Sequence, residues 1–303
     1  MTYSLVIPLK NEAESLLPLY KELKNAISSL KKEYEIIFVD DGSTDNSYEV
    51  LKSLENKDRN IKVIKLRANF GKSYALDKGL EASIGEIIIT LDADLQDDPA
   101  EIPKLISKLN EGFDFVNGWR KKRQDNITKK ISSNLFNLGT SFIAGIRLHD
   151  FNCGLKAFTK EVAKELHLRG ELHRFIPVLA AKNKFRVTEV AVNHRPRKYG
   201  ESKFGKFGLG RSWKGILDLI TTVFISDFSA KPAHFFGSIG LIFFTIGFLM
   251  DAYVTYLKIT TGTTQERIPL LIAGVLFILL GVQLISTGLI AEMVASYYHR
   301  TKS

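Results

Sequence analysis

Two long apolar stretches near the C-terminal end restrict the architecture of this 303-residue chain more than any other feature. Residues 235–250 carry no charged side chain, apolar character continues to Leu257 with Asp251 as its one charged interruption, and residues 268–291 are again free of charge. About 20 apolar helical residues cross the hydrocarbon core of a bilayer, whereas a soluble helix of that length keeps a polar face. We therefore predict an antiparallel transmembrane hairpin with spans at about residues 234–257 and 268–291, in preference to a buried helical hairpin in a soluble core.

The charges beside these spans predict their orientation. Basic residues gather before the first span and after the second, and the loop between the spans is close to neutral. The residues are Lys203, Lys206, Arg211, Lys214 and Lys231 before the spans, Arg300 and Lys302 after them, and Lys258, Glu266 and Arg267 in the loop. Cytoplasmic loops carry an excess of Lys and Arg. We therefore expect a multi-pass protein of the cell membrane, with its N-terminal domain and its C-terminus in the cytoplasm.

Residues 204–232 show a different pattern. Apolar side chains recur there at helical spacing, and charged ones lie off that stripe. The apolar set is Leu209, Trp213, Ile216, Leu217, Ile220 and Phe224. Helices of this kind lie in the membrane interface, although a packing helix of the soluble domain is the alternative. The sequence thus predicts three parts: a soluble domain over 1–203, amphipathic interfacial helices over 204–232, and the hairpin with a short tail over 233–303.

The N-terminal part has the composition of a soluble domain, since 25% of the chain is charged and these residues are concentrated ahead of the spans. Its first apolar run, residues 5–8, is too short for a signal peptide and follows no basic residue, so we expect a domain that is not exported. Cys153 is the single cysteine, which excludes an internal disulfide and a cysteine-rich zinc site.

Short β-rich runs alternate with helical patterns in this domain. The runs are residues 5–8, 36–40, 63–66, 87–92 and 113–117, and apolar residues at helical spacing separate the earlier ones. Such alternation predicts an α/β domain with a mainly parallel sheet that is covered by helices on both faces. Ligands of these folds bind at the carboxyl ends of the strands.

The most informative polar motif follows the run at 87–92. Asp92 and Asp94 can converge on one hard cation where the chain leaves the pleat, and Gln96 can add a third oxygen. Oxygen ligands suit Mg²⁺ or Mn²⁺, which bridge diphosphates. An isolated pair of this kind is usually a solvated acidic turn, but here other acids end neighbouring strands. We therefore predict a metal site formed by Asp92, Asp94 and Gln96.

A second acidic motif follows the run at 36–40. Asp40 and Asp41 lie at a strand tip, where they can bind a base or a ribose, whereas Ser43, Thr44 and Asp45 fit a turn that caps the next helix. Gly71-Lys72-Ser73 is not a phosphate-binding P-loop, because position 66 is Leu66 instead of the required glycine. The glycine fingerprint of dinucleotide-binding folds is also missing after the first run.

Two basic clusters remain, at residues 120–123 with Lys129 and Lys130, and at residues 194–198 with Lys203. A nucleic-acid or anionic-lipid patch is the simplest explanation for such clusters. Arg120, however, follows a strand run and so belongs to the predicted metal edge, and Arg197 and Lys203 lie just before the interfacial helices. Because these cations lie between the predicted metal edge and the membrane, we expect them to bind an anionic lipid head group, and we expect no nucleic acid.

Several stretches together resemble glycosyltransferase family 2, in its polyprenyl-phosphate (dolichol-phosphate-mannose-synthase-like) branch. They are Val6-Ile7-Pro8-Leu9-Lys10-Asn11-Glu12, Val39-Asp40-Asp41-Gly42-Ser43-Thr44-Asp45, Asn69-Phe70-Gly71-Lys72, Asp92-Ala93-Asp94-Leu95-Gln96, Asp150-Phe151-Asn152-Cys153-Gly154-Leu155-Lys156-Ala157-Phe158 and Arg197-Lys198-Tyr199-Gly200-Glu201-Ser202-Lys203. The resemblance covers about residues 3–215 and continues into the hairpin by architecture.

The resemblance implies a Rossmann-like GT-A domain that transfers one sugar, with inversion, from a nucleotide-sugar (a UDP-sugar or GDP-mannose) to a polyprenyl or dolichyl monophosphate, with Mg²⁺ or Mn²⁺. It implies the following residue roles. Pro8, Lys10, Glu12, Asp40, Asp41, Gly71 and Ala75 bind the donor; Asp92, Asp94 and Gln96 hold the metal and diphosphate; Arg120, Lys129, Ser133, Arg197 and Lys203 bind the acceptor phosphate.

Three points stay open at the level of the sequence. Lys10 stands where many relatives have tyrosine, which puts base stacking there in question, and Asp150 is either a catalytic group or a structural one. The Arg-Trp pair of processive synthases is missing, which favours transfer of a single sugar. The alternatives are another lipid acceptor, a non-catalytic nucleotide-sugar-binding membrane protein, and a transporter formed by several copies, while homo-oligomers of the enzyme itself are left open.

Overall fold

The computed structural model describes residues 1–121, 141, 145–196, 232–263 and 267–300. The chain divides into two compact units, Met1–Leu219 and Ile220–Ser303. The expected interfacial helices over 204–232 fall almost entirely on residues outside the described ones. The predicted limits of the three parts therefore stay predictions.

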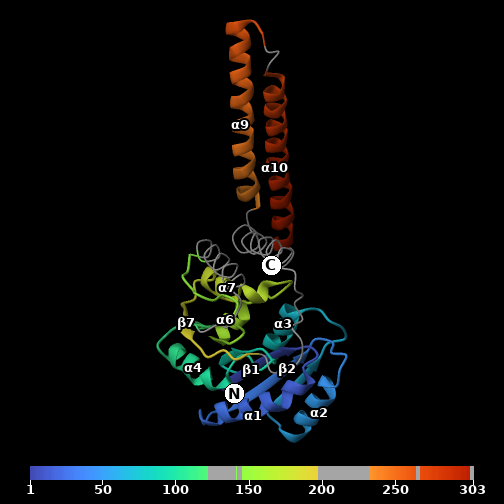
Figure 1. Cartoon of the computed structure of the whole chain (residues 1–303), viewed down its shortest axis with the longest axis vertical. Helices are drawn as coiled ribbons and strands as arrows, with labels where there is room; N and C mark the ends of the chain where they lie inside the picture. Colours follow the sequence, from blue (N-terminus) through green and yellow to red (C-terminus); the bar gives the residue numbers. More distant parts are fainter. Residues whose placement is uncertain (122–140, 142–144, 197–231, 264–266, 301–303) are drawn as a thin grey trace. The chain divides into compact units, whose positions relative to one another are not determined.

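The first unit alternates strands and helices along the chain (Figure 1). Its strands are β1 (Tyr3–Leu9), β2 (Tyr34–Asp40), β3 (Ile61–Lys65), β4 (Ile87–Thr90), β5 (Phe115–Trp119), β6 (Lys156–Thr159) and β7 (Val187–Ala191). Its helices are α1 (Ala13–Ser28), α2 (Ser47–Lys57), α3 (Lys72–Ala82), α4 (Ile102–Asn110), α6 (Lys160–Glu165) and α7 (Ile176–Lys182), with the 3₁₀ turns η1 (Pro99–Glu101) and η2 (Leu172–Arg174).

The described strands form one seven-stranded sheet in the order β3-β2-β1-β4-β6-β5-β7. Among them β6 runs antiparallel to both of its neighbours, β4 and β5, and the other pairings are parallel. The prediction of an α/β domain with a mainly parallel sheet is therefore confirmed. The predicted runs correspond to β1–β5, although β4 ends at Thr90, two residues before the predicted end at Asp92.

Helices cover both faces of this sheet because its central strands are apolar on both sides (Figure 1). All seven residues of β1 are buried. Leu5 and Ile7 pack with apolar residues of α1, α2 and α4, whereas Val6 packs with apolar residues of α3, α6 and α7. Successive side chains of a strand point to opposite faces, so one strand supplies both halves of the core. The result is a three-layer domain with its polar loops at the ends of the strands.

The second unit contains two long apolar helices, α9 (Pro232–Thr261) and α10 (Ile268–Arg300) (Figure 1). Each is long and apolar enough to cross a membrane, with mean hydropathy of 1.8 and 2.7 over its most apolar stretch, and 11% of each stretch is buried. Large apolar side chains such as Leu241, Phe248 and Leu279 are instead exposed. A helix at the core of a soluble protein buries such residues, so this pattern fits a hairpin whose outer surface contacts lipid.

Glycines let the two helices approach closely. A Cβ atom added at Gly240 would lie 2.7 Å from the carbonyl oxygen of Gly281, and one at Gly247 would lie 2.5 Å from that of Gly274. Small residues at such positions allow helix backbones to pack together in a bilayer, where no hydrophobic force drives them together. The carboxylate of Glu292 on α10 also accepts the N–H of Ala233 at 3.1 Å, at the start of α9. These contacts join the predicted spans into an antiparallel pair.

Candidate active site

Polar residues gather at the carboxyl edge of β1, β2 and β4, as the parallel topology requires. The antiparallel strand β6 adds to this edge, because Lys156 at its start pairs with Thr90 at the end of β4. The chain that leads into β6, residues 150–155, therefore reaches the same edge as the acidic loop after β4. A Cβ atom added at Gly154 would lie 2.8 Å from Asp92 Cγ, so the backbone passes directly beside that carboxylate.

Asp41, directly after β2, is held by main-chain groups of the segment between β3 and α3. The N–H groups of Phe70 and Gly71 donate to its two carboxylate oxygens at 2.7 and 2.9 Å. In the amide orientation that suits its neighbours, Asn69 donates to Asp41 at 2.8 Å and accepts from the ammonium of Lys10 at 2.8 Å. The Asn69–Lys72 stretch is thus fastened to the strand tip, and the charge of Asp41 is shared among three donors.

Asp40 differs from Asp41 in one informative way. Its Oδ1 accepts the N–H of Ser43 at 2.9 Å, but its Oδ2 is fully buried and has no hydrogen-bond partner among the described residues. Buried carboxylate oxygens are almost always hydrogen-bonded. The unsatisfied oxygen of Asp40 therefore indicates that something other than the described chain, a ligand or a water, completes this position.

The turn that follows is rigid. Gly42 has a φ of +65°, and a Cβ atom there would lie 2.6 Å from the main chain of Ala68, so this position requires glycine. Asp45 accepts the N–H groups of Ala13 at 3.3 Å and Ser47 at 3.0 Å, at the starts of α1 and α2. The N-cap residue of α2 is Asn46, whose side chain makes no capping bond, so Asp45 acts from the preceding position and ties the loops after β1 and β2 together.

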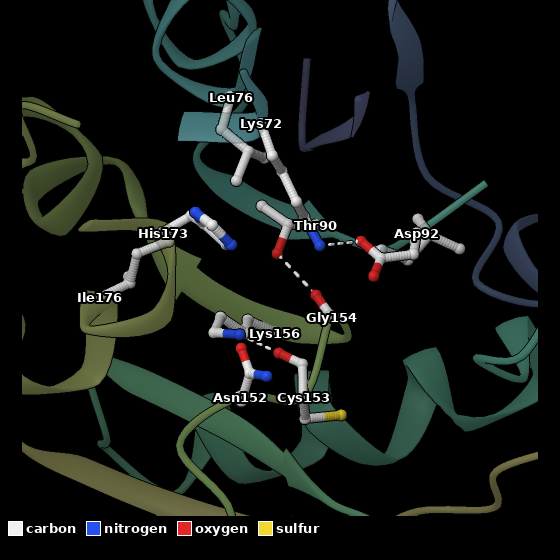
Figure 2. A pocket seen from close by; sticks show the side chains of 11 residues that line it. Lys72, Leu76, Thr90, Asp92, Asn152, Cys153, Gly154, Lys156, His173 and Ile176 are labelled. Atoms are coloured by element: carbon white, nitrogen blue, oxygen red, sulfur yellow. Dashed lines mark hydrogen bonds and ion pairs between the residues drawn. The ribbon is translucent and has the colours of Figure 1, made fainter. Parts of the chain in front are cut away.

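The first acid after β4, Asp92, forms an ion pair with Lys72 at the start of α3 (Figure 2). The Lys72 Nζ lies 2.5 Å from Asp92 Oδ1, and each side chain is 36% exposed. Burial alone would raise the pKa of Asp92, but the positive charge of Lys72 outweighs it and lowers that pKa below its ordinary value. Asp92 is thus ionised at neutral pH and faces a cation of the protein itself.

The rest of the acidic loop turns tightly. Asp94 Oδ1 accepts the N–H of Gln96 at 3.2 Å, across Leu95 with a φ of +62°. The Gln96 amide lies 3.5 Å from the carbonyl oxygen of Arg195, and the N–H of Arg195 donates to the Gln96 carbonyl oxygen at 2.8 Å. Arg195 also binds Asp98 at 2.6 Å and Glu22 at 2.7 Å. Arg195, from the second basic cluster, therefore braces the acidic loop.

A small pocket opens beside Asp92 on the α3 side of the sheet (Figure 2). Its volume of about 10 Å³ is close to that of one water-sized probe. His173 of η2 points into it. The His173 N–H donates to Ser73 Oγ at 3.0 Å, and this hydroxyl lies 2.9 Å from His173 Nδ1. Ser73 therefore holds both the main chain and the ring of His173.

Charges around the pocket keep this imidazole neutral. Burial, together with the nearby cations Lys72 and Arg174, lowers the pKa of His173 to about 2. Lys156 also lines the pocket, where its ammonium donates to the carbonyl oxygen of Cys153, and burial lowers the pKa of this lysine. The pocket therefore presents two lysines and a neutral imidazole next to one carboxylate.

Arg120 and Asp150 form the most buried ion pair of the site. Arg120 Nε and Nη2 donate to the two carboxylate oxygens of Asp150 at 2.6 and 2.9 Å, and the side chains are 10% and 7% exposed. Asp150 is itself held by the N–H of Asn152 at 3.1 Å and, through its carbonyl oxygen, by the amide of Asn117. One edge of the Arg120 guanidinium is therefore occupied, at the end of β5.

The structure distributes the predicted site residues unevenly. Pro8 lies in β1, Gly71 precedes α3, and Ala75 is buried in α3. Glu12 is 9% exposed and donates its N–H to Ser47 Oγ at 2.9 Å. These lie with Asp40 and Asp41 around the ends of β1 and β2. The acceptor residues Lys129, Ser133, Arg197 and Lys203 lie outside the described residues. Their roles, like those of the other predicted site residues, stay predictions.

Sequence reasoning gave no role to Lys72, Lys156 and His173. Lys72 lies in one of the motifs that carry the resemblance. Lys156 lies in another of these motifs, so the resemblance could have placed both lysines at the site. His173 had no such signal, because its partner Ser73 is 100 residues away along the chain.

The donor set after β4 suits a hard divalent cation. Asp92 and Asp94 supply carboxylate oxygens, and the side chain of Gln96 carries a further one. Among the described residues, however, no three His, Cys, Asp or Glu side chains are grouped as a complete metal site. Mg²⁺ is commonly bound by one or two carboxylates together with substrate phosphates. The residues therefore fit a metal that is shared with a phosphorylated ligand.

Comparisons with known proteins agree with this geometry. A model of glycosyl transferase family 2 matches residues 4–167. The chain is 38% identical over 302 residues to a dodecaprenyl-phosphate galacturonate synthase from Rhizobium johnstonii, covering 98% of this chain and 88% of the relative. It is 34% identical over 303 residues to an undecaprenyl-phosphate 4-deoxy-4-formamido-L-arabinose transferase from Salmonella choleraesuis, covering 99% and 90%.

Solved structures support the fold. Glucosyl-3-phosphoglycerate synthase from Mycobacterium tuberculosis, in complex with Mn²⁺, UDP-glucose and phosphoglyceric acid, matches with a TM-score of 0.55 and 20% identity, over 76% of this chain and 82% of that one. The expected GT-A architecture is thus confirmed. With the family model covering more than half of the chain and the two relatives nearly all of it, the chain is a glycosyltransferase that belongs to glycosyl transferase family 2.

Proposed function

We propose that the protein transfers a single sugar from a nucleotide-sugar to a polyprenyl or dolichyl monophosphate and forms a lipid-phosphate-sugar. The observation that carries this proposal is the acidic edge at the ends of β2 and β4, in a chain similar over almost its full length to enzymes named for polyprenyl-phosphate sugars. A UDP-sugar or GDP-mannose is the expected donor. The orphan oxygen of Asp40 is a suitable acceptor for a hydrogen bond from the base or ribose.

The charges suggest how the residues would act. Asp92, Asp94 and Gln96 would hold Mg²⁺ or Mn²⁺, which stabilises the negative charge that develops on a departing diphosphate. The acceptor phosphate is already ionised at neutral pH, so its oxygen can attack the anomeric carbon without a strong general base. Attack opposite the departing diphosphate inverts that carbon. The chain's own contribution is then to hold two anions together in line.

Arg120 is the residue we assign to the acceptor phosphate, together with Lys129, Ser133, Arg197 and Lys203. Its two hydrogen bonds to Asp150 use Nε and Nη2, and we infer that Nη1 binds a phosphate while Asp150 orients the guanidinium. We therefore assign Asp150 to positioning. A base at Asp150 is the competing assignment, which its occupied carboxylate does not favour.

Product analysis tests the proposal directly. Purified protein is incubated with Mn²⁺, a panel of UDP- and GDP-sugars, and either undecaprenyl or dolichyl phosphate or, in a parallel reaction, diacylglycerol, and the lipids are analysed by mass spectrometry. We expect one added sugar on the lipid phosphate, without longer products. Transfer to diacylglycerol in place of the phosphate would favour another lipid acceptor, and donor binding with no product from any pair would favour a non-catalytic protein.

We also propose that this is a cell-membrane protein whose catalytic unit lies in the cytoplasm. Basic residues gather before α9 and at the end of α10, whereas the loop between the two helices is close to neutral. Protease added to sealed inside-out vesicles should digest the N-terminal unit, whereas right-side-out vesicles should protect it. Protection in inside-out vesicles would contradict this orientation.

A further inference from the structure

Lys72 occupies an unusual place for a lysine in a site that is expected to hold a metal. Its ammonium lies 2.5 Å from Asp92 Oδ1, the first of the two acids after β4 (Figure 2). A divalent cation held by Asp92 would compete with this ammonium for the same carboxylate. Asp92 therefore has a positive partner from the protein.

The backbone beneath Lys72 is fixed, so only its side chain can move away. The N–H groups of Phe70 and Gly71, the two residues before it, are held by the carboxylate of Asp41 at 2.7 and 2.9 Å. Lys72 itself begins α3. Its four-carbon side chain is flexible and 36% exposed, which lets the ammonium change partners without any movement of the loop.

The site also lacks a complete cage for a metal among the described residues. Such ions are commonly completed by waters and substrate phosphates, so a diphosphate would add oxygens to those of Asp92 and Asp94. A metal held by Asp92 and Asp94 would compete with the ammonium of Lys72 for Asp92, and a diphosphate that arrives with the metal would offer this ammonium a new anion.

We propose that Lys72 is the internal counter-ion of Asp92 in the donor-free enzyme, and that it exchanges this carboxylate for the donor diphosphate when the metal binds. This inference rests on the proposed function. It makes metal binding weak in the absence of a diphosphate and strong in its presence. Because such coupling is reciprocal, the metal strengthens diphosphate binding by the same factor.

Metal binding to the full-length protein in nanodiscs tests the exchange without any turnover. Free Mn²⁺ is measured by electron paramagnetic resonance in a titration with Mn²⁺ alone and in one with saturating inorganic pyrophosphate, and the Mn²⁺ that pyrophosphate itself binds is subtracted with a matched titration of protein-free nanodiscs. Pyrophosphate binding is measured calorimetrically with Mn²⁺ present. Pyrophosphate serves as the probe because it carries the diphosphate charge and leaves the base and sugar out of the question.

Lys72→Met is the informative variant, since it keeps the length of the side chain and removes its charge. We expect it to bind Mn²⁺ alone about three- to tenfold more tightly than the wild type, because neither displacement of an ion pair nor repulsion opposes the metal. Its affinity for pyrophosphate with Mn²⁺ should fall by about tenfold. Lys72→Arg keeps the charge and should bind Mn²⁺ alone as weakly as the wild type does.

Lys78→Met is the matched control. Lys78 lies on the same helix and forms an ion pair of the same length, 2.5 Å, with Glu81. Its partner Glu81 does not belong to the acidic loop after β4, so both affinities should match the wild type. A thermal unfolding curve for each variant checks that the fold is retained.

The outcomes separate two failures. If the wild type binds Mn²⁺ with pyrophosphate but Lys72→Met changes either affinity by less than twofold, the exchange is wrong and the metal-dependent function stands. If the wild type binds no Mn²⁺ even with pyrophosphate, the metal role in the proposed function fails, and the exchange fails with it.

Discussion

The two halves of the sheet hold their charged residues in different ways. On the parallel half, β3-β2-β1-β4, Asp41 is bound mainly by main-chain N–H groups and Asp92 by a partly exposed lysine. On the other half, β6-β5-β7, Arg120 is bound by the buried carboxylate of Asp150. A carboxylate held by neutral N–H groups keeps its charge for a ligand, whereas a buried ion pair is close to neutral as a whole.

This difference teaches where function and stability separate. Removal of an acid from a half-exposed loop removes charge from a ligand site and leaves the core unchanged. Removal of one partner from a buried pair leaves the other charge unsatisfied inside the protein, which is strongly destabilising. Substitution of a half-exposed acid of the parallel half, such as Asp94, should therefore reduce activity alone, and substitutions at Arg120 should reduce both activity and stability.

The largest effect is expected from Asp94→Asn on the parallel half. Loss of one of two carboxylate charges should lower turnover by about 100- to 1000-fold, while the unfolding free energy changes by less than about 0.5 kcal/mol, because Asp94 is a half-buried loop residue. Lipid product formation and thermal unfolding measure the two quantities. Full activity of chelator-treated wild type would show that the metal role is wrong.

Arg120→Ala, on the other half, should lower stability as well as activity. It leaves the carboxylate of Asp150 buried without its partner, and we expect a loss of about 3 kcal/mol in unfolding free energy. The apparent KM for the lipid phosphate should rise or turnover should fall, whereas donor affinity, measured calorimetrically without lipid, should stay within twofold. Arg120→Lys should recover only part, because the ammonium lacks the planar fork.

The donor measurement is decisive for the role of Arg120. If Arg120→Ala loses donor binding and keeps the wild-type dependence on lipid, the residue belongs to the nucleotide side of the site. If activity is unchanged and only the stability falls, Arg120 is a structural partner of Asp150, and the acceptor phosphate is bound elsewhere.

Asp150→Asn sharpens the same half with a smaller change. If Asp150 positions Arg120, the amide weakens that pair, and the acceptor KM should rise by about tenfold, roughly the effect of one misplaced supporting group. The shape of the dependence of kcat/KM on pH should stay that of the wild type. Disappearance of one limb of that profile would instead assign Asp150 as a proton acceptor.

Much of the parallel half follows from the sequence because its signals are local. The runs that become β1, β2 and β4 are largely apolar, and the acids that follow them lie within four residues of the strand ends. Parallel strands place these tips at one edge, so proximity follows from topology. The two long apolar helices are equally local, since length and the missing charges suffice.

The other half depends on contacts between distant residues and could not be predicted in the same way. β6 spans only Lys156–Thr159 and β7 contains Thr188 and Glu189, so neither shows an apolar run. The pairing of Arg120 with Asp150 joins residues 30 apart across a strand reversal. The motifs predict that Arg120 and Asp150 both belong to the site, but they do not show that the two charges neutralise each other.

The smallest expected effect concerns the pocket between these halves. His173 is held neutral, with its pKa lowered from 6.5 to about 2 by burial and by nearby cations. The unfolded chain therefore binds a proton between these pH values that the folded chain does not, so stability rises with pH across this window. Acidification from pH 7 to pH 5 should cost the wild type about 1–2 kcal/mol through this one group, with partial exposure of the ring already discounted.

His173→Gln isolates that contribution, because glutamine keeps a hydrogen-bonding side chain and does not titrate. Thermal unfolding of both proteins at pH 7 and pH 5 gives the difference of differences, in which all shared titrating groups cancel. We expect the wild type to lose more stability than the variant on acidification. An equal loss in both proteins would mean that the imidazole takes up a proton in the folded state, and the pocket beside Lys72 and Lys156 would then accommodate a third positive charge.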